Sequence, residues 1–308
     1  MAQDPLQQIT DSLVADLEAV IAGDRKRSPF STPWAKAGFP ANALTGAEYN
    51  GLNTLILWHK AKVKGYSNNK WVTFKQIKMI EGGEHAHVRK GEKATVIVRY
   101  VSWVPRSFGK IDNDTYIHKT YGTTHSKDEA TMNTLRAYNV FNVEQVVDLP
   151  DEYYKLPDQG ATLTNDELKW FVAETGAMIE HGGDRAFFNY GRDRIGMPRV
   201  AAFNSEDHYW GILFHELGHW TGHKSRLDRP LSQEKNLYAF EELVAEITSA
   251  FLSSRFGLKA EMQHVEYLEG YVKALKEDAT VLRKAAAASQ KAFDYLIGAG
   301  QEEQEQAA

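Results

Sequence analysis

Residues 215–223 read His-Glu-Leu-Gly-His-Trp-Thr-Gly-His. Residues four apart share one face of a helix, so the imidazoles of His215 and His219 can bind one metal ion. Glu216 stands beside the first histidine, where a general base of metal-assisted hydrolysis is expected. This stretch therefore predicts a helix that carries a metal site, and it decides how the second half of the chain is interpreted.

A third metal ligand is expected about 20 residues later, on a predicted helix over 237–256. Glu242 and Glu246 are one helical turn apart there. One of them can bind the metal while the other accepts a hydrogen bond from a ligand histidine. We assign Glu242 as the ligand and Glu246 as the outer partner; the opposite assignment, and Glu241 as the ligand, stay open.

Two more residues are candidates for the surroundings of the metal. His223 follows His219 by four residues, whereas a third histidine ligand of the metzincin type follows by six, so we place His223 outside the ligand set. Tyr238 lies between the two motifs and is a candidate to support an oxyanion. The chain has no cysteine, so the donors are nitrogen and oxygen, and Zn²⁺ is the expected metal, although other divalent ions accept the same donors.

The length and composition favour two globular domains. The chain has 308 residues, 43% hydrophobic and 25% charged, which is typical of folded proteins. We expect domains over 1–150 and 151–300 and a disordered tail over 301–308. No apolar run is long enough to span a membrane and no basic segment precedes an apolar block, so we expect a cytoplasmic protein without a membrane partner.

Charge is distributed unevenly between the two predicted domains. Residues 1–150 have a net charge of +4 and the remainder −9, and residues 25–110 alone carry +12. Four of the seven tryptophans lie in that basic stretch: Trp34, Trp58, Trp71 and Trp103. Lysine and arginine neutralise phosphates and aromatic faces stack on unpaired bases, a combination typical of single-strand binding. A core role for most of these aromatic side chains is the alternative.

The candidate DNA contacts are the basic residues of this stretch together with one tryptophan: Lys60, Lys62, Lys64, Lys70, Trp71, Lys75, Arg89, Lys90 and Lys93. Single-stranded DNA is the expected partner, because no motif for duplex recognition is present.

The coarse pattern of elements is mixed α+β in the first domain and mainly helical, with a small sheet, in the second. The expected elements are a helix over 5–22, a capping box at Thr45 and Glu48, another at Thr73 and Gln76, a strand over 94–104, a lobe over 105–130, a strand over 138–147, an edge strand over 185–190, and an N-cap at Ser205 with a helix end at Gly222.

The chain resembles the ArdC-type antirestriction proteins encoded on conjugative plasmids. The resemblance rests on Tyr49–Asn53, Trp71–Gln76 and Val88–Lys93 in the first part, and on His215–His223 and Tyr238–Glu246 in the second. It implies a single-stranded-DNA-binding domain followed by a zincin-like metallopeptidase domain. It also implies that the protein protects incoming plasmid DNA from host restriction, with a protein substrate such as a component of the host restriction system.

Two functions follow from these expectations. The first is a DNA-binding zinc peptidase. The alternative is a non-catalytic protector that coats single-stranded DNA and uses its metal for structure. A Glu216 variant separates them, because only the first function needs that carboxylate.

Overall fold

The computed structural model describes residues 5–22, 38–156, 163–230, 235–258 and 268–299. The predicted tail over 301–308 and Trp34 lie outside the described residues. In chain order the elements are α1 (Pro5–Ile21), β1 (Ala41–Asn42), α2 (Gly51–Lys64), β2 (Lys70–Thr73), α3 (Phe74–Ile77), β3 (His87–Val88), β4 (Thr95–Trp103), β5 (Phe108–Lys110), β6 (Thr115–His118), β7 (Thr124–Ser126), α4 (Lys127–Ala130), β8 (Met132–Asn142), η2 (Val143–Gln145), β9 (Val146–Val147), α5 (Asp151–Tyr154), α6 (Asn165–Glu174), β10 (Met178–His181), β11 (Phe187–Asn189), β12 (Arg194–Met197), η3 (Val200–Ala202), α7 (Glu206–Thr221), α8 (Lys235–Arg255), α9 (Leu268–Glu277) and α10 (Thr280–Ala299).

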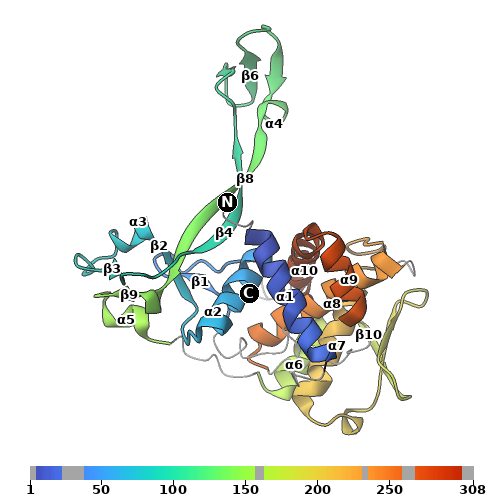
Figure 1. The fold of residues 1–308 in the computed structure, drawn as a ribbon. Helices are drawn as coiled ribbons and strands as arrows, with labels where there is room; N and C mark the ends of the chain where they lie inside the picture. The colour runs from blue at the N-terminus through green and yellow to red at the C-terminus, as the bar shows by residue number, and fades with distance from the viewer. Residues whose placement is uncertain (1–4, 23–37, 157–162, 231–234, 259–267, 300–308) are drawn as a thin grey trace, which may run out of the picture.

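The helices form one body in which α7, α8 and α10 pack together, with α1 lying against α9 and α2 against α10 (Figure 1). Its core is continuous and includes the fully buried side chains of Leu17, Leu57, Phe214, Phe251 and Leu296. Two helices from the first 64 residues therefore complete a body whose other helices come from the second half of the chain.

Aromatic side chains join these two parts of the chain. The ring of Phe39 lies 5.4 Å from that of Trp58 and 5.5 Å from that of Phe293. Trp58 also meets Phe251 edge to face, at 5.7 Å. Such pairs add about 0.5–1.5 kcal/mol each beyond their burial. The predicted boundary near residue 150 stays a prediction, and the hydrophobic core is shared by residues on both sides of it.

A four-stranded sheet in the order β1-β2-β8-β4 lies beside the helical body. β1 runs parallel to β2, and the other two pairings are antiparallel. Neighbouring residues of β2 face opposite sides of the sheet: Trp71 joins the main core, and Val72 joins a second cluster with Ile77 and Val143. Both faces of the sheet are therefore covered at its base.

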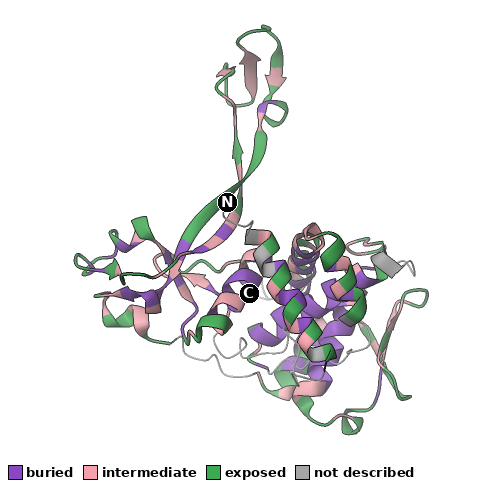
Figure 2. Cartoon of the chain, in the orientation of Figure 1, coloured by how far each residue is buried: buried purple, intermediate pink, exposed green. Residues whose placement is uncertain are grey.

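Beyond its base, the β4–β8 pair continues as a two-stranded ribbon that projects from the body (Figure 1). The side chain of Asn53 on α2 fixes its start, since Nδ2 donates to the Val98 carbonyl at 2.7 Å and Oδ1 accepts from the Val98 amide at 2.9 Å. The end of the ribbon carries the small β5-β6-β7 sheet. The predicted lobe over 105–130 is confirmed as this ribbon tip, and most of the ribbon is exposed (Figure 2).

A second small sheet, β10-β12-β11, lies against α7 in the second half of the chain. β11 is one of its edges and pairs antiparallel with β12, so the edge strand predicted over 185–190 is present at 187–189. The mixed α+β class is confirmed. Among the described residues, none of the helices has the length and the apolar character that crossing a membrane requires.

The two predicted capping boxes had different outcomes. Thr73 and Gln76 form a reciprocal capping box at the start of α3, as predicted. The prediction of a capping box at Thr45 and Glu48 is wrong, because α2 begins at Gly51 with Asn50 as its N-cap. Thr45 instead accepts a hydrogen bond from the Ala47 amide within a turn.

Candidate metal centre

The predicted metal helix is α7, and its start is set by local hydrogen bonding. The hydroxyl of Ser205 accepts from the His208 amide, and Glu206 and Asp207 lie in the first turn, where carboxylates favour the helix dipole. α7 packs closely on α8. The closest approach is at Gly218, where an added Cβ would lie 2.8 Å from the Cα of Ala245. Only glycine therefore permits this separation of the two helices.

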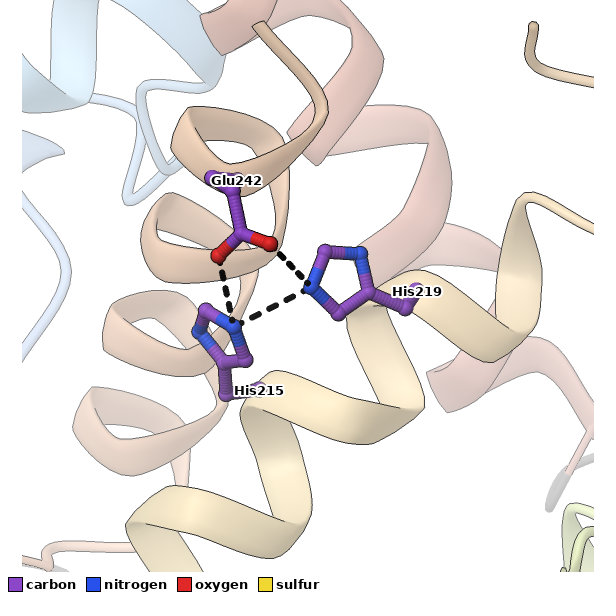
Figure 3. Close-up of side chains that lie close together, drawn as sticks. All are labelled: His215, His219 and Glu242. Carbon is purple, nitrogen blue, oxygen red and sulfur yellow. Dashed lines mark hydrogen bonds and ion pairs between the residues drawn. The ribbon is translucent and has the colours of Figure 1, made fainter. Parts of the chain in front are cut away.

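Close packing of α7 on α8 brings three side chains to one point (Figure 3). Nε2 of His215 and Nε2 of His219 are 3.1 Å apart. The carboxylate of Glu242 lies opposite them, with Oε2 at 3.4 Å from His215 Nε2 and Oε1 at 3.5 Å from His219 Nε2. These three residues are the one group in the described part of the chain whose spacing suits a metal ion.

Each histidine is held from behind by a second glutamate of α8. Nδ1 of His215 lies 3.1 Å from Oε2 of Glu246, and Nδ1 of His219 lies 3.4 Å from Oε1 of Glu241. A proton shared at each Nδ1 leaves Nε2 as the atom that can bind a cation. Glu246 occupies the place assigned to it from the sequence. Glu241, left open there as a ligand, is the matching partner of the second histidine.

Arg229 in turn fixes Glu241. Its guanidinium donates to both oxygens of Glu241, at 3.0 and 2.7 Å, and also to Thr221 Oγ1 at 2.8 Å and the Gly218 carbonyl at 2.6 Å. The Arg229 and Glu241 side chains are 9% and 5% exposed. A buried ion pair with these additional hydrogen bonds ties the segment after α7 to α8 and sets the direction of His219.

The carboxylates at the site shift the pKa values of both histidines. Burial opposes protonation of His219, yet hydrogen bonds to Glu241 and Glu242 raise its pKa to about 9. The pKa of His215 is likewise raised, by Glu242 and Glu246 against burial. Burial favours the neutral form of Glu242, but both histidines lower its pKa. The carboxylates of Glu241, Glu242 and Glu246 therefore favour positive charge at the two imidazoles.

The donor set suits a divalent metal. Two imidazole nitrogens and a carboxylate oxygen converge, and Oε2 of Glu242 is fully buried, 3.4 Å from His215 Nε2. A buried carboxylate beside two imidazole nitrogens is the combination of donors that borderline divalent metals accept. Three protein ligands also leave a position open, which is typical of catalytic rather than structural zinc.

The other candidates from the sequence differ in burial and in their contacts. Glu216 is 4% exposed, and its negative charge acts on the neighbouring His215. Tyr238 is 37% exposed at the start of α8. After α7 ends, His223 Nδ1 bonds Ser225 Oγ at 2.7 Å and its ring packs on Tyr190 at 4.6 Å, so its place in the surroundings of the metal stays a prediction.

The candidate DNA residues are partly dispersed. Trp71 is fully buried, so its assignment as a base contact is wrong. Lys70 donates to the carbonyls of Glu152 and Lys155, and Lys62 pairs with Asp16 at 3.3 Å. Five residues are exposed on the surface: Lys64, Lys75, Arg89, Lys90 and Lys93.

A smaller basic group remains near the end of α2. Lys64 and Lys93 both act electrostatically on Lys60, whose pKa is lowered by burial first and then by Lys64, against the attraction of Glu92. Arg89 is exposed and donates to the Glu144 carbonyl. Lys60, Lys64 and Lys93 therefore form a cluster of like charges, which we call the α2 basic cluster.

Two family models match the chain in order. Residues 3–141 match the N-terminal domain of the anti-restriction factor ArdC, and residues 166–288 match a zincin-like metallopeptidase. The first model covers the sheet and the ribbon, and the second covers the metal helix and its partner α8.

Relatives match across both parts. The chain is 30% identical over 302 residues to the uncharacterized protein y4eC of Sinorhizobium fredii (strain NBRC 101917 / NGR234), which covers 95% of this chain and 91% of that protein. It is 32% identical over 306 residues to the DNA primase TraC of Escherichia coli, over 94% of this chain. The chain spans 27% of that primase.

Solved structures agree with this assignment. The metal-free crystal structure of the antirestriction protein ArdC from plasmid R388 superposes with a TM-score of 0.75 at 34% identity, covering 97% of this chain and 99% of that one. The Mn(II)-bound form gives 0.73 at 35% identity, with 96% and 98% covered. The chain therefore belongs to the ArdC family, with an ArdC N-terminal domain followed by a zincin-like metallopeptidase domain that contains the His215, His219 and Glu242 group.

Proposed function

We propose that this protein is a zinc-dependent peptidase joined to a single-stranded-DNA-binding region, and that it protects incoming plasmid DNA from host restriction. The observation that carries the peptidase proposal is the converging group of His215, His219 and Glu242, with the buried Glu216 next to His215 in the chain. The antirestriction role is supported by the likeness to ArdC from plasmid R388.

In this proposal the chain supplies three ligands and a base. A bound Zn²⁺ would polarise a scissile carbonyl and acidify water. Glu216 accepts the proton of the attacking water and returns it to the leaving amine. Glu246 and Glu241 hold the imidazoles of His215 and His219 through Nδ1, so both Nε2 atoms face the reaction centre.

An extended peptide could reach this centre along β11. β11 pairs with β12 on one side alone among the described residues, and its other edge offers backbone groups to a further strand. The same small sheet contacts α7 through β11 and β12. The expected substrate is a protein of the restriction machinery, which we infer from the antirestriction role.

The choice of zinc is also part of the proposal. The related R388 protein has a Mn(II)-bound structure, and two imidazoles with one carboxylate accept both ions. Zinc binds such nitrogen donors more tightly than Mn²⁺ in the general order of metal affinities. Metal analysis of protein purified without added metal should therefore find zinc in excess over manganese; manganese alone would contradict the choice.

The DNA part of the proposal is supported by the charge of residues 25–110 and by the α2 basic cluster. The likeness to a DNA primase is consistent with it. We expect affinity for single strands to fall steeply with salt, because phosphate contacts release counterions. A salt-independent affinity would contradict this part of the proposal.

Glu216→Gln tests the whole proposal, because glutamine keeps the shape and removes the base. DNA entering a restricting recipient by conjugation should lose protection with this variant, while metal content and single-strand affinity stay at wild-type levels. Full protection by Glu216→Gln would favour the alternative, a non-catalytic protector that coats DNA. A matched Glu269→Gln variant, at an exposed position of α9, controls for loss of one carboxylate.

A further inference from the structure

The face of the β4–β8 ribbon carries two arginines directly opposite each other. Arg99 on β4 and Arg136 on β8 are Cα partners in the register, and both are exposed. Like charges at directly opposed positions destabilise a strand pair. Within the described residues, neither guanidinium has a hydrogen bond or an ion pair with a carboxylate, so folding does not explain this pair.

No carboxylate lies along the ribbon strands to offset the charge. The sequences of β4, TVIVRYVSW, and of β8, MNTLRAYNVFN, contain no aspartate or glutamate. The ribbon also stands away from the body, exposed on its outer length (Figure 2). Its positive charge is therefore available to an anionic partner.

Exposed aromatic rings flank the arginines on the same face. Side chains of a strand alternate between faces, so the cross-strand pairs Ile97–Tyr138, Arg99–Arg136, Val101–Thr134 and Trp103–Met132 share one side of the ribbon. Tyr138 is 38% exposed and Trp103 is 39% exposed. The indole nitrogen of Trp103 donates to Thr134 Oγ1 at 2.9 Å, which draws the ring across the ribbon towards the arginines.

The arginines and the aromatic rings match the two chemical features of single-stranded DNA, its phosphates and its unpaired bases. Guanidinium groups pair with phosphates, and aromatic faces stack on bases of any sequence. Met132, the cross-strand partner of Trp103, lies six residues from Tyr138 along β8, so the two ring-bearing positions are about 20 Å apart at the rise of a strand. A duplex would hide its base faces, so the exposed rings favour an unpaired strand.

We propose that the β4–β8 ribbon face formed by Arg99, Arg136, Trp103 and Tyr138 binds single-stranded DNA. The proposal rests on the proposed function for the partner class, and it places the principal contact on the ribbon rather than on Trp71 or the α2 basic cluster. The arginines hold two phosphates and the rings stack on bases at either side.

The test compares variants of the full-length protein by fluorescence anisotropy with a labelled oligothymidylate of about 20 nucleotides, between about 50 and 200 mM salt. Arg99→Gln with Arg136→Gln should reduce the salt slope of log affinity by about 1.4, that is about 0.7 for each lost phosphate contact. Trp103→Ala and Tyr138→Ala should each weaken binding at least about fivefold. Trp103→Phe and Tyr138→Phe, which keep a ring, should retain most of the affinity.

A matched control removes the same charge elsewhere. Lys273→Gln with Lys291→Gln alters two exposed lysines on α9 and α10 and should leave the salt slope unchanged. If the wild type binds and the ribbon variants behave like this control, the ribbon proposal is overturned while the proposed function stands. If the wild type does not bind the oligonucleotide, the DNA part of the proposed function fails, and the ribbon proposal with it. If the ribbon variants keep DNA affinity but lose protection in conjugation, the ribbon contacts a protein and the proposal is likewise overturned.

Discussion

The α7–α8 metal site and the β4–β8 ribbon arrange charge in opposite ways. At the metal site, the side chains of His215, Glu241, Glu242 and Glu246 are buried and that of His219 is half-buried, and each of the five contacts an opposite charge or a hydrogen-bond partner. On the ribbon, two arginines face each other in solvent without a carboxylate on either strand. A buried site must satisfy its charges within the fold, whereas an exposed surface can leave them for a partner.

This difference determines how each region responds to substitution. Changes at the metal site should alter stability and metal binding together, because the same hydrogen bonds serve both. Changes on exposed basic surfaces should alter binding and leave stability nearly constant. The expected effects therefore decrease in size from the metal ligands to the α2 basic cluster.

The largest effect is expected from removal of a metal ligand. His219→Ala leaves two ligands and should lower metal affinity by about 4 kcal/mol, roughly a thousandfold, which is one ligand's share of a typical zinc site. Metal content of the purified variant, measured by mass spectrometry, should fall below about 0.2 per chain.

His223→Gln is the matched control for this prediction. His223 follows the same helix and contacts Ser225 and Tyr190, and it is not one of the three side chains whose spacing suits a metal ion. It should keep the wild-type metal content. Equal loss in both variants would mean that the histidines act through folding, and would count against a specific site.

The next largest effect is expected at Arg229. Arg229→Ala leaves the carboxylate of Glu241 buried and without its main partner, which should cost about 3 kcal/mol in the free energy of unfolding. Metal affinity should also fall, by about tenfold, because Glu241 orients His219. Denaturant unfolding of the metal-free protein and a metal titration give the two values separately.

Arg226→Ala provides the comparison. Arg226 also pairs with a carboxylate, that of Asp193, but the Asp193 side chain is 37% exposed and water can replace the lost partner. The loss of stability should be smaller than for Arg229→Ala, and metal affinity should not change. An Arg226 variant that lost metal as strongly would show that burial of the partner is not the deciding factor.

A smaller loss is expected from a methyl group between the helices. The Cβ of Gly218→Ala would lie 2.8 Å from the Cα of Ala245, so α7 and α8 must separate at a cost of about 2 kcal/mol. Gly298→Ala, in α10 with nothing within 4 Å of its Cβ, should instead stabilise by about 0.5 kcal/mol through helix propensity. Thermal unfolding of the two variants side by side checks the opposite signs.

The sequence predicted the metal site well because its information is local. Spacing placed His215 and His219 on one face, and Ser205 marked the start of their helix. The role of Glu241 could not be read in the same way. Glu241 and Glu242 are adjacent, so the rotation of α8 against α7 decides which of them binds the metal. That rotation follows from the packing of the two helices at Gly218 and Ala245, which are 27 positions apart in the chain.

The DNA surface was harder to predict, because the positions of charged and aromatic residues in the sequence do not show which of their side chains are exposed. Trp71 and Trp103 both lie in basic stretches, yet strand register buries the first and exposes the second. The strand predicted over 94–104 is confirmed as β4, but its partner begins at 132 rather than 138. The residues between 132 and 138 include Arg136. Its position opposite Arg99 follows from the pairing of β4 with β8, which the sequence pattern did not predict.

The smallest effect on stability is expected in the α2 basic cluster. Lys60 is half-buried, and its pKa is lowered by burial, then by Lys64 and, more weakly, Lys93. A lysine with a lowered pKa binds fewer protons in the folded than in the unfolded state between its two pKa values. Stability therefore rises with pH through that window, and the full cost is present below it. Lys64→Ala removes one repulsive charge, so the pKa of Lys60 should lie closer to its unfolded value. The pH range over which stability changes should therefore become narrower.

At neutral pH, Lys64→Ala should raise the free energy of unfolding by no more than about 0.5 kcal/mol, because solvent screens the repulsion. The affinity for single-stranded DNA should decrease, because the contact of Lys64 with a phosphate is lost. The slope of log affinity against log salt should fall by about 0.7. A charge that slightly destabilises the fold and strengthens DNA binding is retained for binding. If Lys64→Ala instead lowers stability and leaves the salt slope unchanged, the cluster serves the fold, whereas folding gives no account of the Arg99–Arg136 pair on the ribbon.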